Sequence, residues 1–180
     1  MLMRAPQSVL LVVDIQERLA PAIHDSDAVI ANTAWLLQVA AKVGVPVLAT
    51  EQYPAGLGVT VPALRGLIPA EAIAEKTHFS AVAEGNLFDL PGGERRQYVV
   101  TGTETHVCVL QTVMDLLAGG RQVFVVAEAV GSRKPADKEL ALERMRAAGA
   151  RIVSREMVAF EWLHRAGTDL FRAVSRDFIR

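Results

Sequence analysis

The sequence predicts a single α/β domain in which helices cover both faces of a six-stranded, mainly parallel sheet. Short runs of Val, Leu and other strand-forming residues alternate with longer segments of helical periodicity, as in repeated βαβ units. The length of 180 residues fits one domain, and 51% hydrophobic residues are enough to build a core without a disulfide or a structural metal. We therefore expect a three-layer α/β/α sandwich over residues 1–180.

Strands are expected wherever an apolar run is too short for a helix. The unbroken Val and Leu run at residues 8–13 is typical of a central strand buried on both faces. The other runs, of which the third is the most polar, lie at residues 45–50, 72–77, 97–102, 122–127 and 151–154.

Helices are expected between these strands, where apolar residues recur at helical spacing. They lie at residues 27–43, 105–117 and 135–149, and over the tail from residue 156 with a break near residue 167. Ligands of such sheets bind beyond the carboxyl ends of the strands, near the point where the strand order reverses. Functional residues are therefore expected in the segments that follow the strands.

Composition excludes several classes of function. A net charge of −1 without blocks of like charge argues against binding to nucleic acid or to a membrane surface. No run is long enough to span a bilayer or to serve as a secretory signal, so we expect a cytoplasmic protein. One cysteine excludes a multi-cysteine zinc site, and neither metal-spaced histidines nor a phosphate-binding glycine loop is present. No metal and no cofactor are expected.

Two residues after predicted strands could carry chemistry. Asp14 directly follows the first strand, where partial desolvation suits a general base, although it could instead cap the next turn. Cys108 falls in the first turn of the helix after the fourth strand, if Thr105 is the N-cap residue. Free N–H groups there favour a thiolate and can lower its pKa below about 8.5, whereas the alternative is a small buried apolar residue.

Basic residues nearby offer further candidates. Lys76 lies near the end of the third strand, where it could hold an anionic partner or simply be a surface lysine. His78 is an alternative base for Cys108. His106 is discounted as a base, because residues two apart on a helix point in nearly opposite directions.

An Asp that closes the first strand, a Lys after the third and a Cys that opens the helix after the fourth, in this order, resemble the isochorismatase-like cysteine hydrolases. The matching segments are residues 12–16, 76–80 and 102–109, and the similarity covers residues 8–161. The loop at residues 50–58 is similar to that of the isochorismatase-domain-containing subgroup. The resemblance implies a Rossmann-like sheet of order 3-2-1-4-5-6, which sets the first and fourth strands side by side.

The resemblance also implies a catalytic mechanism. Asp14 would take the proton of Cys108, Lys76 would hold Asp14 and balance charge, and the thiolate would attack an amide or related C–N carbon to form a thioester. True isochorismatases lack the cysteine, and the metal-binding residues of nicotinamidases are missing from residues 51–53. A metal-independent, amidase-type hydrolase is therefore expected, with nicotinamide a doubtful substrate.

An oxyanion hole is part of the same resemblance. It implies a cis peptide between Thr103 and Glu104, which would aim the backbone N–H groups of Thr105 and Cys108 at one point. A pair of such donors could stabilise a tetrahedral oxyanion.

The expected partners are a small-molecule substrate and further copies of the chain. Gln16, Gln52 and Phe79 are candidates for lining the substrate pocket. The resemblance favours a homo-oligomer, whereas the apolar face of the tail helix could equally pack on its own domain. The alternative function is a catalytically silent or redox-responsive binding or scaffold protein that retains the fold.

Overall fold

Six parallel strands form one sheet of order β3-β2-β1-β4-β5-β6, as expected. The computed structural model describes residues 1–179, so residue 180 of the predicted domain lies outside the described residues. The strands are β1 (Ser8–Val13), β2 (Val47–Gln52), β3 (Ile73–Lys76), β4 (Gln97–Thr103), β5 (Gln122–Gly131) and β6 (Arg151–Val153).

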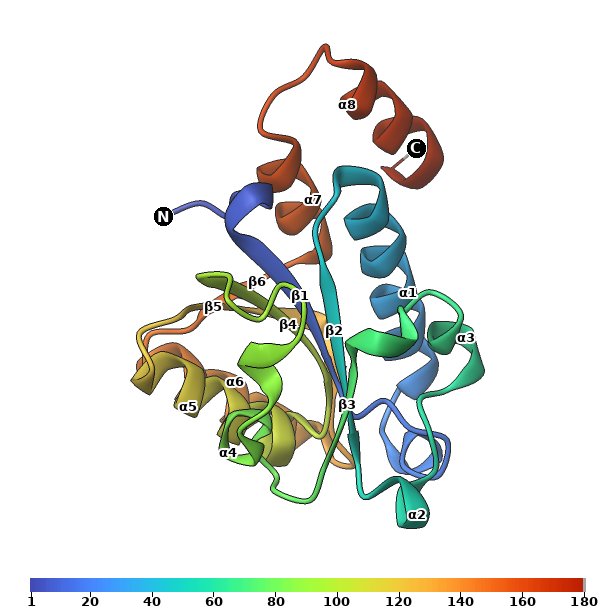
Figure 1. Ribbon diagram of the computed structural model, residues 1–180, viewed down its shortest axis with the longest axis vertical. Helices are drawn as coiled ribbons and strands as arrows, with labels where there is room; N and C mark the ends of the chain where they lie inside the picture. Colours follow the sequence, from blue (N-terminus) through green and yellow to red (C-terminus); the bar gives the residue numbers. More distant parts are fainter. Residues whose placement is uncertain (180) are drawn as a thin grey trace.

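Helices cover both faces of this sheet and confirm the three-layer sandwich (Figure 1). One layer holds α1 (Ser26–Val43), α3 (Pro62–Arg65), α7 (Arg155–Leu163) and α8 (Asp169–Val174). The other layer holds α4 (Ala81–Glu84), α5 (Leu110–Ala118) and α6 (Pro135–Ala147), and the short α2 (Pro54–Leu57) follows β2. No helix within residues 1–179 combines the length and the apolar character needed to cross a bilayer.

The core is centred on β1 and β4. Every residue of both strands is buried, because these neighbouring strands lie in the middle of the sheet with helices on each face. Their Val and Leu side chains account for the continuous apolar runs in the sequence. The carboxyl ends of β1 and β4 consequently lie side by side, with β2 and then β3 on the other side of β1.

Several boundaries differ from the expected ones. The second strand runs on to Gln52 and the fifth to Gly131, into polar or small residues that ladder hydrogen bonds retain in the sheet. The segment expected as one helix over residues 105–117 is a π-helical turn, Thr105–Val109, followed by α5. Apolar spacing did not distinguish this wider turn from an α-helix.

The tail packs on its own domain. The Trp35 indole N–H of α1 donates to the Phe178 carbonyl at 2.9 Å, and the two rings meet edge to face. Asp177 also forms an ion pair with Lys42. This packing places the apolar face of the tail against α1.

Candidate active site

Asp14 lies in the turn immediately after β1. Its backbone is in the left-handed region at φ 49°, which is uncommon for a residue other than glycine. The Asp14 N–H donates to the Thr50 carbonyl at 3.1 Å, and the Thr103 hydroxyl donates to the Asp14 carbonyl at 2.7 Å. Bonds from both neighbouring strands thus hold this turn in place.

Gly102 allows β4 to approach β1 closely at the same level. Its φ is +129°, and a Cβ atom built there would lie 2.1 Å from the Val13 carbonyl oxygen. Any larger residue would push the two strands apart next to Asp14.

The Asp14 carboxylate is fully buried and bonded at both oxygens. The Thr50 hydroxyl donates to Oδ1 at 2.7 Å, and the Lys76 ammonium donates to Oδ2 at 2.8 Å. Buried carboxylates are normally paired and hydrogen-bonded, as Asp14 is here. These contacts show that its side chain pairs with Lys76 and Thr50, whereas the alternative was a role as a cap of the next turn.

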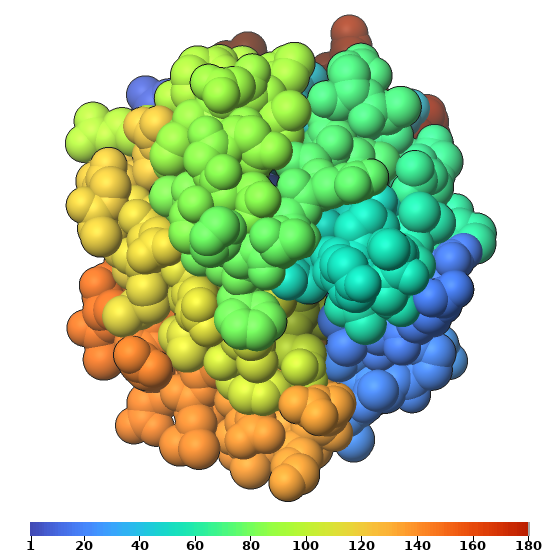
Figure 2. All heavy atoms as spheres, turned by 60° about the horizontal axis from the view of Figure 1, so that its bottom comes forward, coloured from blue at the N-terminus to red at the C-terminus, as the bar shows by residue number. Residues whose placement is uncertain are grey.

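Lys76 is buried at the end of β3 and is therefore not an ordinary surface lysine. Besides Asp14, its ammonium has three acceptors within hydrogen-bond distance: the Gln52 side-chain oxygen at 2.5 Å and the carbonyls of His78 and Phe79 at 3.2 and 2.9 Å. The three N–H groups of the ammonium are shared among these four acceptors. The chain that leaves β3 thus curls around the lysine nitrogen. In Figure 2 this green segment lies beside the yellow-green start of α5.

Cys108 lies on the buried side of the turn that follows β4. Cys108 is 6% exposed. The peptide bond between Thr103 and Glu104, at the start of this turn, is cis, as the resemblance implied. Within residues 1–179 the Glu104 carbonyl accepts hydrogen bonds from the N–H groups of Val107 and Val109. It accepts none from the N–H of Cys108, which lies between them.

Burial, followed by the negative charge of Asp14, raises the pKa of the Cys108 thiol from 9.0 to about 12, while Lys76 acts in the opposite direction. The expected lowering of this pKa is therefore wrong. The cost of desolvating a thiolate beside a carboxylate outweighs the favourable effect of the helix terminus. The charges of Asp14 and Lys76 thus influence the pKa of the Cys108 thiol in opposite directions.

The glutamines expected to line a substrate pocket are occupied by other contacts. The Gln16 amide is buried and donates to the carbonyls of Gln52 and Gly58, at 3.0 and 2.7 Å, and it accepts the Gln52 N–H at 2.7 Å. The Gln52 side chain joins Lys76 to the Thr77 carbonyl. Both amides hold loops together in this state. Phe79, in contrast, is 52% exposed and its ring is free to contact a ligand.

Neither histidine near the site faces the thiol as a base. The His78 ring is exposed and pairs with Glu84 at 2.7 Å, so the alternative in which it activates Cys108 is wrong. The His106 ring bonds to the Ser132 hydroxyl at 2.9 Å. Within residues 1–179, no group of three or more His, Cys, Asp and Glu side chains is placed to hold a metal ion.

Thr50 is the residue at this site that sequence reasoning missed. It is paired with Val13 in the sheet register, and its hydroxyl contacts Asp14 directly. A signal was present, because Thr50 ends the predicted second strand, which adjoins the first in the implied sheet order.

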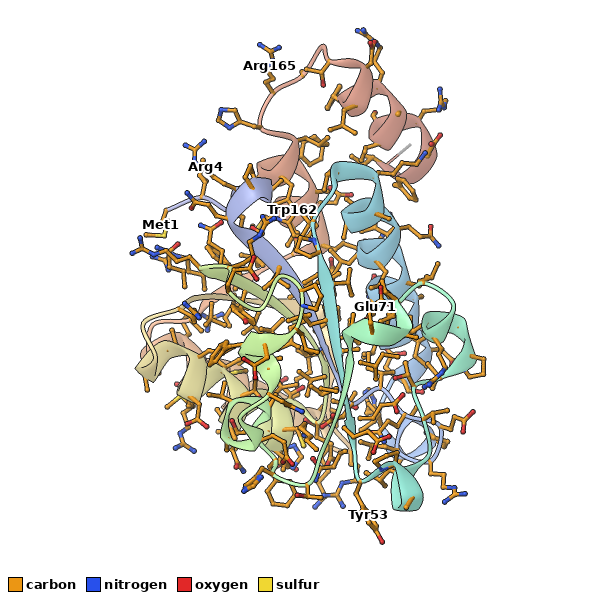
Figure 3. The ribbon with its side chains drawn as sticks, viewed as in Figure 1. Met1, Arg4, Tyr53, Glu71, Trp162 and Arg165 are labelled. Carbon is orange, nitrogen blue, oxygen red and sulfur yellow. The ribbon has the colours of Figure 1, made fainter. Side chains whose placement is uncertain are left out.

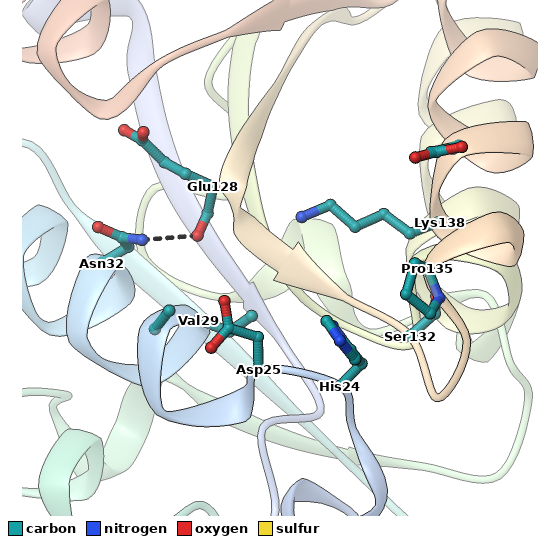
Figure 4. Close-up of a pocket in the computed structure, with 10 residues that line it drawn as sticks. His24, Asp25, Val29, Asn32, Glu128, Ser132, Pro135 and Lys138 are labelled. Carbon is teal, nitrogen blue, oxygen red and sulfur yellow. Dashed lines mark hydrogen bonds between the residues drawn. The ribbon is translucent and has the colours of Figure 1, made fainter.

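Two cavities adjoin the carboxyl edge of the sheet. One of about 470 Å³ lies between the starts of α1 and α6, where Lys138 extends across it (Figure 4), and Asp14 and Cys108 are not among its lining residues. A second cavity, of about 290 Å³, is lined by Lys76, Glu84 and Tyr53 among others. The Tyr53 side chain, which is among the residues that line this cavity, points away from the sheet (Figure 3). Of the Asp14–Lys76–Cys108 cluster, only Lys76 lines this second cavity.

The fold and this site define a hydrolase-type α/β/α domain with a buried thiol at the carboxyl edge of its sheet. The chain belongs to the isochorismatase domain family, whose model matches residues 8–157. The family expected from the sequence is thereby confirmed.

Individual relatives cover most of the chain. Isochorismatase domain-containing protein 1 of Salmo salar is 41% identical over 86% of this chain and 54% of its own length, so the chain spans about half of that relative. The structure of MAR1 ribonuclease from Caenorhabditis elegans is 33% identical and matches 98% of this chain and 91% of its own at a TM-score of 0.88. YcaC from Pseudomonas aeruginosa, with hexane-2,5-diol and covalent acrylamide, is 25% identical over 99% of this chain and 92% of its own, at a TM-score of 0.89.

Proposed function

We propose that the protein is a metal-independent cysteine hydrolase that cleaves an amide or related C–N bond of a small molecule through a thioester on Cys108. The observation that carries this proposal is the buried Asp14–Lys76 pair, 2.8 Å apart, together with the influence of both charges on the pKa of the buried Cys108 thiol. A base, a cation and a nucleophile in mutual reach are the parts that covalent acyl transfer needs.

Acylation begins from the protonated thiol. As the sulfur bonds to the carbonyl carbon, its proton passes to Asp14, so a thiolate need not persist before the substrate arrives. The carbonyl oxygen becomes an oxyanion, which in this proposal accepts hydrogen bonds from the backbone N–H groups of Thr105 and Cys108. Each such donor typically contributes about 3–4 kcal/mol to transition-state stabilisation. The C–N bond then breaks, and the leaving amine takes the proton from Asp14.

Deacylation uses the same groups in reverse. Asp14 accepts a proton from water while the water oxygen bonds to the thioester carbon. The C–S bond then breaks, the acid leaves, and the Asp14 proton returns to sulfur. Lys76 keeps its charge throughout and balances the carboxylate or the oxyanion.

The structure of YcaC guides the choice of ligand. That structure holds covalent acrylamide, a small neutral amide that reacts with nucleophiles. Small neutral carboxamides are accordingly the first substrates to test on this chain.

The redox-responsive alternative fits the site less well. Redox-sensing cysteines are typically accessible and have lowered pKa values. Cys108 is buried and its pKa is raised to about 12. A silent scaffold remains as an outcome of the experiment below.

The experiment is a turnover screen of the purified chain against small amides, carbamoyl compounds and RNA, the last because the Caenorhabditis elegans neighbour is named a ribonuclease. We expect amide turnover that falls about 10⁴-fold in Cys108→Ala and in Asp14→Asn, as losses of catalytic groups do elsewhere. His78→Ala is the matched control, since its ring faces solvent. Turnover that survives in Cys108→Ala, or RNA cleavage without amide turnover, contradicts the proposal.

A further inference from the structure

The Thr105 hydroxyl is buried and has no hydrogen-bond partner. Within residues 1–179, four fully buried side-chain polar atoms lack a partner, and they belong to Thr33, Thr105, Arg121 and Trp162. Among these residues, Thr105 is the one in the turn that carries Cys108. Buried hydroxyls are normally bonded, so an unbonded one beside a reactive group calls for a physical reason.

The local backbone offers this hydroxyl no acceptor. Within a helix, a threonine hydroxyl commonly bonds to the carbonyl four residues back. For Thr105 that residue is Thr101, which lies in β4 and not in the helix. The sequence left open whether Thr105 is the N-cap residue; that position is held by Glu104, and no side chain caps the turn. Thr105 therefore does not cap the turn, and the hydroxyl is left available.

Thr105 lies on the buried side of its turn together with Cys108. In the five residues of the turn, Thr105, Cys108 and Val109 are buried, and the two others are partly exposed. The other donors of the cluster are already engaged, because Lys76 has four acceptors around it and the Thr50 hydroxyl bonds to Asp14.

We propose that the Thr105 hydroxyl donates a hydrogen bond to the carbonyl oxygen of a small carboxamide bound at Cys108. This inference rests on the proposed function and deepens it, because it makes the substrate oxygen the missing partner of a buried donor. Thr105 then supplies two donors to one oxygen, its backbone N–H and its side chain. Ligands that bring no acceptor oxygen leave the hydroxyl unbonded and are selected against.

Two alkylating probes separate this role from general reactivity of the thiol. With acrylamide, sulfur bonds to the terminal alkene carbon and the π electrons shift to the carbonyl oxygen. The proton that Asp14 takes from the thiol ends on the α-carbon. With iodomethane, sulfur bonds to the methyl carbon, iodide leaves, and no oxygen gains charge. The ratio of the two second-order rate constants at Cys108 therefore reports on donors to the oxygen.

The experiment measures both rate constants by intact mass for wild type, Thr105→Val, Thr105→Ala and Thr105→Ser at one pH. We expect the acrylamide-to-iodomethane ratio to fall about tenfold in the valine and alanine variants, the effect of one lost bond to a charged oxygen. Serine, which keeps the hydroxyl, should hold the ratio within about threefold of wild type. An unchanged ratio in the variants without a hydroxyl overturns the inference, as does a serine variant that behaves like valine.

Failure of the proposed function gives a different result. If wild-type Cys108 reacts with acrylamide no faster than the same cysteine in urea-unfolded chain, the site does not activate the thiol and both proposals fall. If wild type is activated and only the ratio is insensitive to Thr105, the inference alone falls. Circular dichroism shows which variants fold, and the alanine variant replaces valine if the latter does not.

Discussion

Replacing Lys76 with methionine leaves the Asp14 carboxylate buried without its cation. The two side chains are 1% and 0% exposed, and their charged atoms are 2.8 Å apart. Removing one member of a buried pair typically costs about 3–5 kcal/mol, because the remaining charge is uncompensated. The change also removes the donor to the Gln52 side chain and to the carbonyls of His78 and Phe79. We therefore expect Lys76→Met to lie at the upper end of that range.

The assay is urea unfolding at pH 7 of wild type, Lys76→Met, Asp14→Asn and the double variant. Domains are typically stable by about 5–15 kcal/mol, so a loss of this size is readily measured. Removing both charges should cost less than the sum of the two single changes, with a coupling of about 1–3 kcal/mol. Full rescue is not expected, since the other acceptors around Lys76 stay unpaired. A loss below about 1 kcal/mol in Lys76→Met, or strict additivity, would refute the account of this pair.

Three further predictions concern the thiol, the strand contact and the tail. Because the pKa of Cys108 is raised to about 12, the free energy of unfolding should fall as pH rises from about 9 toward 12, by at most about 4 kcal/mol. Cys108→Ala should flatten this part of the stability curve in thermal melts, and an identical curve would contradict the raised pKa. Gly102→Ala brings a Cβ to 2.1 Å from the Val13 carbonyl oxygen and should lower the free energy of unfolding by more than about 3 kcal/mol. The control, Gly44→Ala, has open space around its Cβ and should lower it by about 1 kcal/mol. Equal losses in urea unfolding would argue against a close strand contact. Deleting residues 168–180 should lower the free energy of unfolding, because the tail packs on α1. The number of subunits calculated from the light-scattering mass should not change. A change in that number would show that the tail forms a subunit contact.

Most of the fold could be predicted because its central strands, β1 and β4, are buried on both faces. Such strands need continuous apolar runs, and the runs at β1 and β4 stand out in the sequence. Asp14, Lys76 and Cys108 stood out as candidates because each lies at or just after the end of a strand and their order resembles a known family. Strand ends and the π-helical turn were harder to place, since ladder bonds and local packing determine them and leave little trace in hydrophobic spacing.

The electrostatics of the site could not be predicted in the same way. The thiol pKa depends on how deeply Cys108 is buried and how close Asp14 comes, and neither is visible in local sequence. The contacts of Thr50 and Gln52 with the charged pair depend likewise on neighbouring strands that are distant in the chain. Local rules for helix ends therefore gave the wrong direction for the pKa of Cys108.

The most direct test of the account is rapid-quench peptide mapping of the protein during turnover of an amide that it hydrolyses. The account predicts an acyl group on the peptide that contains Cys108, formed before the acid product and absent from Asp14→Asn. Continued hydrolysis with the acyl group on another residue, or with no acylated peptide at any time in single-turnover samples, would contradict it.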